Sequence, residues 1–112
     1  MDNKHRRRRL AKICVLAGLF LVASVAAKAA EHTVVIEGMQ FAPATLEVRP
    51  GDTVIWKNKD PYPHTATAVG GSGFDSGEIK PDRSWKFVAK KAGTFPYECT
   101  LHKTMTGKLV VK

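Results

Sequence analysis

Residues 45–57 read TLEVRPGDTVIWK, and the pattern of this stretch predicts the class of fold. Apolar and polar side chains alternate from Thr45 to Arg49, which is typical of a strand with one buried face. Pro50-Gly51 follows as a turn pair, and an apolar run from Thr53 to Lys57 comes soon after it. We therefore expect two β-strands connected by a turn.

Short strands with turn residues between them continue on both sides of this stretch. No segment has convincing helical spacing, and the remaining expected strands cover residues 32–37, 65–69, 74–79, 84–88, 94–99 and 107–112. About seven short strands at a spacing of about ten residues predict an all-β protein, an antiparallel β-sandwich with Greek-key connections. Its expected core includes the large apolar residues Trp56, Trp85, Phe87, Phe95 and Val110.

The N-terminus has the order of a secretory signal peptide. Residues 1–12 are rich in lysine and arginine, residues 13–27 are apolar apart from Ser24, and Ala27-Lys28-Ala29 is a small-x-small cleavage site. We predict a signal peptide over residues 1–29 and one domain over residues 30–112. The alternative is an uncleaved membrane anchor, for which the apolar run is short, because a membrane span needs about 20 residues.

The basic segment also bears on the route of export. Residues 7–12 read RRRLAK and resemble the twin-arginine export pattern, while an ordinary basic head on a general secretory signal fits equally well. Either route predicts an exported protein. Cys14 belongs to the leader, so Cys99 is left as a lone cysteine in an oxidising compartment and needs an explanation.

Removal of the leader changes the charge of the protein. The whole chain has a net charge of +8, whereas residues 30–112 keep 11 of the 18 basic and 9 of the 10 acidic residues, a net charge of +2. Most of the positive charge therefore belongs to the leader, and nucleic-acid binding has no support. A chain of this size forms one small domain, often helped by a metal, and we expect a monomer.

The segment Cys99-Thr-Leu-His-Lys-Thr-Met105 brings a thiol, an imidazole and a thioether into a loop between two expected strands. Each alone has a simpler interpretation, as a buried apolar thiol, a hydrogen-bonded surface histidine or a methionine of the core. Together they suit a soft metal, and the best candidate for a fourth ligand is His64, at the start of another strand. A cysteine and two histidines with a weak axial methionine form the blue-copper arrangement.

These residues belong to motifs by which the chain resembles the cupredoxins, most closely the amicyanin and plastocyanin group. The resemblance covers essentially the whole of residues 30–112. It rests on FAPATLEV at 41–48, PGDTVIWKNKD at 50–60, Pro63-His64, GTFPYECTLH at 93–102 and Met105-Thr-Gly107. The two-residue gap between His102 and Met105 is similar to that of amicyanin.

The resemblance implies one mononuclear copper ion per chain, bound by His64, Cys99 and His102 and, axially, by Met105. It implies a periplasmic type 1 copper protein that carries single electrons by Cu(II)/Cu(I) cycling and is not an enzyme. Its implied partners are redox proteins such as a c-type cytochrome or a periplasmic dehydrogenase. Around His102 we expect an apolar docking patch and lysines that steer an acidic partner. The patch would consist of Pro63, Leu101 and Thr104, and the lysines are Lys57, Lys59 and Lys103.

Two residues depart from the family pattern. Thr65 stands where the family usually has an asparagine that braces the cysteine loop, and Glu98 stands where histidine or tyrosine is common. Thr65 can still offer its backbone N–H to the sulfur of Cys99 and its hydroxyl to the brace. Neither residue is a ligand, so the departures concern the reduction potential and the choice of partner.

Other functions are consistent with parts of this pattern. A copper enzyme needs further copper sites, and the chain has no His-x-His pair. A non-redox copper chaperone or storage protein favours open sites rich in methionine or cysteine. A structural zinc site is disfavoured here because methionine is a poor ligand for zinc. A separate hypothesis concerns Ala30-Glu31-His32: cleavage after Ala29 would create a terminal amine with histidine in third place, an arrangement that can bind Cu(II) or Ni(II).

Overall fold

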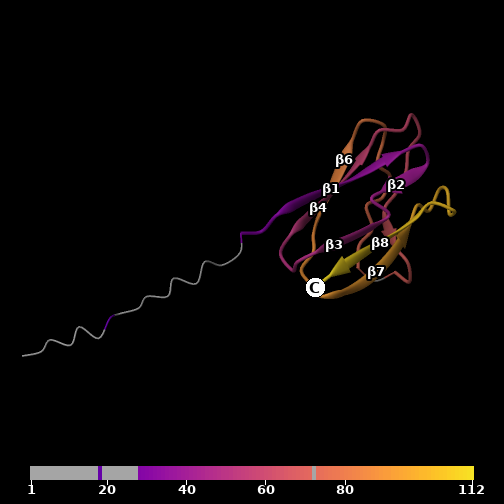
Figure 1. Ribbon diagram of the computed structural model, residues 1–112. Coiled ribbons are helices and arrows are strands. Elements are labelled where there is room, and N and C mark those ends of the chain that lie inside the picture. Colours follow the sequence, from indigo (N-terminus) through magenta and orange to yellow (C-terminus); the bar gives the residue numbers. More distant parts are fainter. Residues whose placement is uncertain (1–17, 19–27, 72) are drawn as a thin grey trace, which may run out of the picture.

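The computed structural model describes residue 18, residues 28–71 and residues 73–112 (Figure 1). Most of the predicted signal peptide lies outside these residues. Within the described part of the chain the regular elements are all strands, as expected, and no helix is long and apolar enough to cross a membrane. The strands are β1 (Glu31–Glu37), β2 (Gln40–Ala42), β3 (Thr45–Val48), β4 (Thr53–Asn58), β5 (Thr67–Ala68), β6 (Ser84–Val88), β7 (Gly93–Glu98) and β8 (Thr106–Val111).

The strands form two four-stranded sheets, in the orders β2-β1-β4-β6 and β3-β8-β7-β5. This confirms the predicted β-sandwich, but the expectation of purely antiparallel pairing is wrong for two pairs of strands. β1 runs parallel to β4, and β3 runs parallel to β8. The reason is that the chain changes sheet at Pro50-Gly51 and does not fold back as a hairpin, so β4 returns alongside β1 in the same direction.

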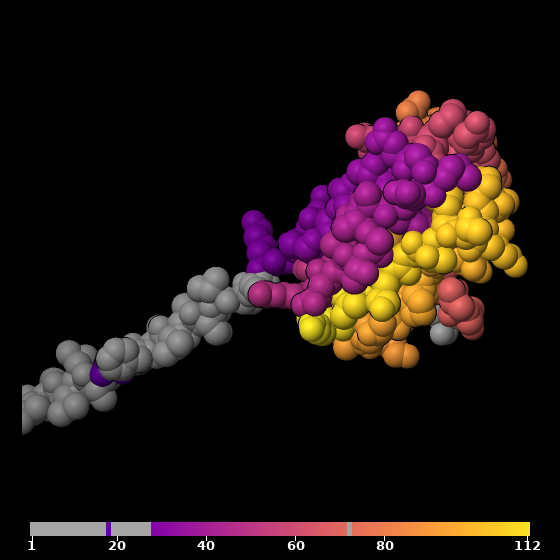
Figure 2. Space-filling model, turned by 45° about the vertical axis from the view of Figure 1, so that its right-hand side comes forward, coloured from indigo at the N-terminus to yellow at the C-terminus, as the bar shows by residue number. Residues whose placement is uncertain are grey.

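The β3–β8 pair joins an early part of the chain to its last strand. Their register runs from Thr45 opposite Lys108 to Val48 opposite Val111. In the space-filling view the yellow residues of β8 lie along the magenta residues of β3 (Figure 2). This pairing is what holds β3 in its sheet, because β3 has no other neighbour there.

The core lies between the inner faces of the sheets. Alternate residues of β1 and β4 are fully buried, namely Val34, Ile36, Val54 and Trp56, as period-two patterning requires. The Trp56 ring packs edge-on against Tyr97 at 5.5 Å between ring centroids. Of the other predicted core residues, Trp85, Phe87 and Phe95 are partly buried against this core.

Val110 is a correction to the predicted core. Its neighbours Leu109 and Val111 are the buried residues of β8, and Val110 is only half-buried. Three consecutive apolar residues cannot all face one side of a strand, because successive side chains point to opposite faces. An apolar triplet alone does not reveal which of its members face inward.

Two strand predictions also need correction, and one strand was missed. Residues 74–79 form no strand; Asp75 and Ile79 make only isolated bridges, to Thr67 and His64 respectively. The predicted strand over residues 65–69 is reduced to β5. The short strand β2 was not predicted, because it depends on the Gly38-Met39 turn that pairs it with β1.

Candidate metal centre

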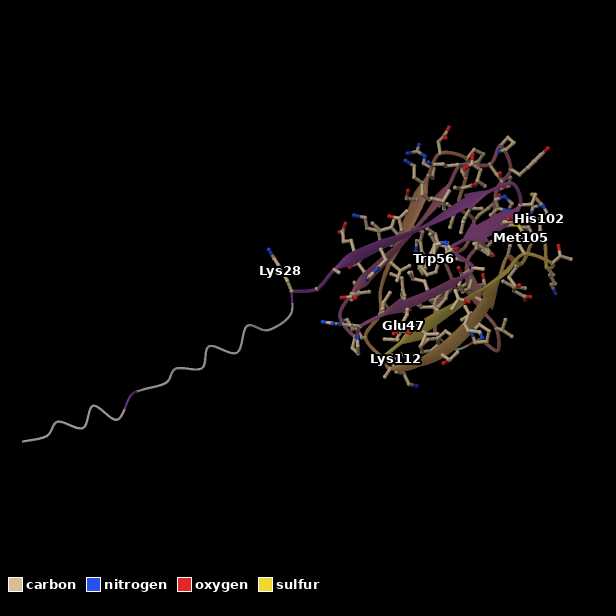
Figure 3. All side chains as sticks on the ribbon, in the orientation of Figure 1. Lys28, Glu47, Trp56, His102, Met105 and Lys112 are labelled. Atoms are coloured by element: carbon tan, nitrogen blue, oxygen red, sulfur yellow. The ribbon has the colours of Figure 1, made fainter. Side chains whose placement is uncertain are left out.

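The loop between β7 and β8 is closed by its own backbone. The Cys99 N–H donates to the carbonyl of Met105 at 3.1 Å, and the Met105 N–H donates to the carbonyl of His102 at 2.9 Å. The His102 N–H donates to the carbonyl of Cys99 at 3.3 Å. These bonds fold the segment back on itself at one end of the sandwich, where His102 and Met105 lie (Figure 3).

His64 reaches the same end from a different part of the chain. Its backbone N–H and carbonyl are both bonded to Ile79, at 3.1 and 2.7 Å, and these two bonds fix its position before β5. The imidazole is fully buried. The prediction that His64 lies beside Cys99, 35 residues away in the chain, agrees with this placement.

Three of the four predicted ligands converge. The sulfur of Cys99 lies 3.8 Å from Nδ1 of His64 and 3.6 Å from Nδ1 of His102. The ligand atoms of these residues all lie within 4.8 Å of one another. Donors bound to one ion at about 2.0–2.3 Å stand at separations of this order, so a thiolate and two imidazoles can share one metal here. Their chemistry suits copper.

Met105 is buried at the base of this loop. It also lines a surface pocket of about 160 Å³ together with Met39, Phe41 and Thr104. Met39 itself is exposed and sits in the turn between β1 and β2. Of the two methionines, Met105 is the one carried on the same loop as Cys99 and His102.

Asp60 is a part of the site that the sequence interpretation missed. Its carboxylate oxygen Oδ2 lies 2.8 Å from Nε2 of His64, so it accepts the proton of that nitrogen. This bond leaves the lone pair on Nδ1, the nitrogen that faces the sulfur of Cys99. Asp60 therefore orients the imidazole and selects the tautomer that can bind a metal.

Asp60 is itself held by two backbone groups. Gly38 and Met39, both with positive φ, donate their N–H groups to its two oxygens at 2.6 and 2.9 Å. Burial by itself would raise the pKa of Asp60, but the N–H groups of Met39 and Gly38 and the His64 ring outweigh it and lower the pKa. The carboxylate is thus kept ionised beside His64.

The loop that carries Asp60 is shaped by Asn58, which is fully buried. The Asn58 amide oxygen accepts the Asp60 N–H at 2.9 Å, and its amide nitrogen donates to the carbonyls of Tyr62 and Ile79. Residues 58–64 are therefore folded around one side chain. The spacing of four residues between Asp60 and His64 is the only signal in the sequence that points to this pair.

The comparisons with known proteins extend over the whole domain. The sequence pattern of the cupredoxin-like domain matches residues 12–111. The chain belongs to the cupredoxin family.

Its similarity to amicyanins supports the same assignment. Amicyanin of Paracoccus denitrificans is 32% identical over 93 residues, covering 78% of this chain and 71% of the relative. Amicyanin-alpha of Methylorubrum extorquens is 28% identical, covering 94% of this chain and 99% of the relative. A solved structure of an amicyanin variant with Cu(I) is 33% identical, has a TM-score of 0.68 and is covered over 88% of its length by 80% of this chain.

These findings confirm the class of function predicted from the sequence. The protein is a blue copper electron carrier with one copper ion per chain, and it is not an enzyme. Copper supplies a centre that accepts and releases one electron. What this chain adds is the set of residues that orient the ligands.

Thr65 braces the cysteine loop of this cupredoxin in the way expected for it. Its backbone N–H points to the sulfur of Cys99 at 3.4 Å, and its hydroxyl oxygen accepts the Thr100 N–H at 2.8 Å. The direction of the Thr65 hydroxyl proton is set by two residues outside the loop, Thr67 and Asp75. Thr67 donates its hydroxyl to Asp75 at 3.1 Å, so the Thr67 oxygen can accept the hydroxyl proton of Thr65 at 3.0 Å.

The surface around His102 combines apolar and basic residues. His102 is half-buried, and Leu101 and Tyr62 beside the ligand loops have exposed fractions of 51% and 56%. The predicted patch residue Thr104 is exposed and Pro63 is half-buried. The three lysines predicted to steer a partner, Lys57, Lys59 and Lys103, are all exposed. Tyr62, two residues before His64 in the chain, is a further exposed aromatic side chain.

Proposed function

We propose that His64, Cys99 and His102 bind the copper ion of this cupredoxin, with Met105 as a weak axial ligand. The convergence of the three ligand atoms within 4.8 Å of one another is the observation that carries this assignment. Met105 completes the set because it is buried and is bonded through its backbone to Cys99 and His102.

The protein contributes rigidity to this site. His64 is held by Asp60, and the sulfur of Cys99 receives the N–H of Thr65, so neither side chain is free to change its position with the charge of the site. Ligands that stay in place reduce the rearrangement that accompanies gain or loss of an electron. The half-buried His102 is the ligand nearest to solvent and is the route by which the electron enters and leaves.

The partner is a redox protein in the periplasm, such as a c-type cytochrome or a dehydrogenase. Leu101, next to His102 in the chain, and Tyr62, two residues before His64, offer exposed apolar contact area. The exposed lysines of the docking surface favour a partner with an acidic patch, because charges of opposite sign raise the rate of encounter. The protein acts as a monomer.

Export requires the leader. Residues 1–29 act as a signal peptide that is cleaved after Ala29, by either the twin-arginine or the general secretory route, and residues 30–112 form the working domain. Strands β1 to β8 all lie within these residues, so the domain does not need the leader for its sheets.

The test is a Cu(II) titration of residues 30–112, followed by the intense visible band of thiolate-bound copper. We expect a blue product at one copper ion per chain, and no such band in Cys99→Ser. A matched pair, Met105→Leu and Met39→Leu, checks the axial ligand: the first should shift the band and the reduction potential, and the second should change neither. Colourless copper binding by the native sequence would contradict the carrier and indicate a chaperone or storage protein.

A further inference from the structure

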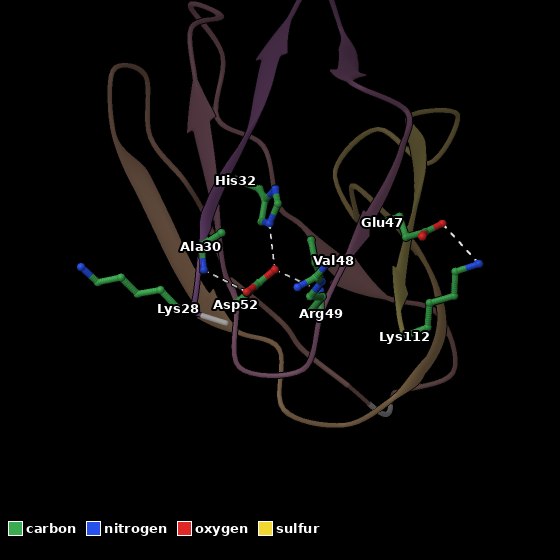
Figure 4. Close-up of a pocket in the computed structure, with 8 residues that line it drawn as sticks. All are labelled: Lys28, Ala30, His32, Glu47, Val48, Arg49, Asp52 and Lys112. Atoms are coloured by element: carbon green, nitrogen blue, oxygen red, sulfur yellow. Dashed lines mark hydrogen bonds and ion pairs between the residues drawn. The ribbon is translucent and has the colours of Figure 1, made fainter. Parts of the chain in front are cut away.

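A second polar cluster lies at the end of the sandwich where the leader joins the domain, opposite the metal centre (Figure 3). It surrounds a pocket of about 250 Å³ (Figure 4). The lining residues are Lys28, Ala30, His32, Glu47, Val48, Arg49, Asp52 and Lys112. At its centre is Asp52, which is buried with an exposed fraction of 5%.

The Asp52 carboxylate collects hydrogen bonds from three directions. One oxygen accepts the backbone N–H of Ala30 at 2.9 Å. The other lies 2.9 Å from Nε2 of His32 and accepts the backbone N–H of Arg49 at 3.0 Å. The N–H of Ala30, then that of Arg49, then the His32 ring lower the pKa of Asp52 from 3.8 to about 2. Asp52 therefore ties the start of β1 to the turn before β4.

Ala30 is the residue that would become the N-terminus after cleavage. Residues 28–30 are exposed and precede the first strand, so the Ala29–Ala30 bond lies at the edge of the folded domain. The Ala30 carbonyl accepts the N–H of Thr53 at 2.9 Å, and its own N–H is held by Asp52. The nitrogen that cleavage would free is thus already placed against a buried carboxylate.

We propose that Asp52 is the binding site for the α-ammonium group that removal of the leader creates at Ala30. The inference rests on the proposed cleavage after Ala29. Water hydrolyses the Ala29–Ala30 bond, Ala29 leaves as a carboxylate, and the Ala30 nitrogen becomes a protonated amine. A neutral amide N–H at 2.9 Å is then replaced by a cation with three donors, and such charge-assisted bonds are the stronger ones. Maturation therefore strengthens the closure of this end of the sandwich.

The pairing has a defined pH window. A free α-amine has a pKa of about 7.7–8.0, and pairing with the Asp52 carboxylate raises the pKa of the Ala30 amine in the folded protein above this range. The stability that the pair contributes is therefore complete below about pH 7.7. It is lost as the pH rises through the raised pKa of the folded protein. On the acid side, stability from Asp52 is present above its ordinary pKa of 3.8 and is lost as pH falls toward 2. The other charged or titratable groups facing the pocket of the mature chain are His32, Glu47, Arg49 and Lys112.

The same contacts disfavour the square-planar metal site considered for Ala30-Glu31-His32. That site needs the terminal amine and the backbone nitrogens of Glu31 and His32. In the structure the Ala30 nitrogen is held by Asp52, and β1 pairs along β4 from Glu31 opposite Thr53 onward. Binding Cu(II) in this way would open the first pairs of the strand.

The experiment compares residues 30–112 with residues 29–112 in denaturant at pH 7. The longer chain keeps the Ala30 N–H but carries its amine one residue away. We expect the unfolding equilibrium constant of the 30–112 chain to be smaller by about three- to five-fold. Asp52→Asn should abolish this difference. Glu47→Gln is the matched control, because Glu47 lines the same pocket but pairs with Lys112, whereas the Ala30 N–H is held by Asp52; this variant should leave the difference in place.

A second measurement does not depend on the folding of the Asp52 variant. Titration of the Ala30 amine by NMR in the 30–112 chain should give a pKa at least half a unit above about 8. Equal stability of the two chains, or an amine pKa at the free value, would overturn the pairing with Asp52. N-terminal sequencing of the exported protein tests the leader separately: a start at Ala30 is expected, and any other start would overturn the proposed cleavage and the role of Asp52 in maturation.

Discussion

At the scale of single residues, Asp60 does more for the metal centre than its place outside the ligand set suggests. It accepts three donors, the N–H groups of Gly38 and Met39 and the ring of His64. An asparagine in its place has one oxygen and presents an NH₂ group to a donor. We predict that Asp60→Asn lowers Cu(II) affinity about 10- to 100-fold, because the His64 imidazole loses the partner that selects its tautomer.

Competition with a chelator of known Cu(II) affinity measures this loss. Asp82→Asn is the matched control. Asp82 is exposed, and its substitution removes the same charge at a residue that is not a ligand. Asparagine is also well tolerated at the positive φ of residue 82. Equal affinities in the two variants would show that the carboxylate has no orienting role.

Thr65 offers a second prediction at this scale. Thr65→Val keeps the shape of the side chain and the N–H directed at Cys99, but removes the oxygen that accepts the Thr100 N–H at 2.8 Å. We expect the free energy of unfolding to fall by about 1 kcal/mol, with a shift of the visible copper band as the cysteine loop loosens.

Thr65→Ser is the control for this change, since it restores the hydroxyl and should recover most of the stability and the band. Denaturant unfolding and the visible spectrum, measured on both variants, decide the matter. If the valine and serine variants behave alike, the hydroxyl is not the brace.

The difference between ligand and supporting residues explains how far the site was predictable. Cys99, His102 and Met105 can be recognised as candidate ligands in the sequence because three metal-binding side chains lie close together in the chain. His64 is then selected because a fourth ligand is needed. Asp60 has only its four-residue spacing from His64, which does not by itself indicate a role at the site. Its role arises only when the Gly38-Met39 turn, more than twenty residues earlier, folds against it, which is a property of packing.

At the scale of elements, the β7–β8 pair has little room between its strands. Gly107 stands opposite Tyr97, and a Cβ built on Gly107 would lie 2.5 Å from the Tyr97 hydroxyl oxygen. The ring cannot move aside freely, because it packs edge-on against Phe41 at 4.8 Å and Trp56 at 5.5 Å. We predict that Gly107→Ala lowers the free energy of unfolding by about 1–3 kcal/mol.

Denaturant unfolding of the copper-free protein tests this expectation. Thr106→Ala, at the exposed neighbouring position of β8, should cost much less. The double variant Gly107→Ala with Tyr97→Leu should recover part of the loss, because the clash is with the tip of the ring. An additive double variant would refute the clash.

Individual strands were predictable because the alternation of apolar and polar residues lies within a single segment of the chain. The alternation of β3 and the apolar run of β4 depend only on which face is buried. Pairing depends on two strands and on the path between them, so the parallel β1–β4 and β3–β8 pairs were not visible in either strand alone. The segment 74–79 looks like a strand but has no neighbour with which to form a full ladder.

At the scale of the whole molecule, the two polar centres occupy opposite ends of one sandwich. Lys28 and Lys112 mark the leader end and His102 and Met105 the metal end, with Trp56 between them (Figure 3). No described residue belongs to both the Asp52 pocket and the ligand group. Changes at one end should therefore act independently of changes at the other.

Copper removal tests this independence. A metal that binds only the folded protein stabilises it by about 2.7 kcal/mol when its free concentration is about 100 times the dissociation constant. We predict that copper increases the free energy of unfolding of the native 30–112 chain and of its Asp52→Asn variant by the same amount, within about 0.5 kcal/mol. The reason is that the two sites share no contacts. Cys99→Ser should gain much less. A copper effect that changes by more than this in Asp52→Asn would mean that the two ends are coupled through the core around Trp56.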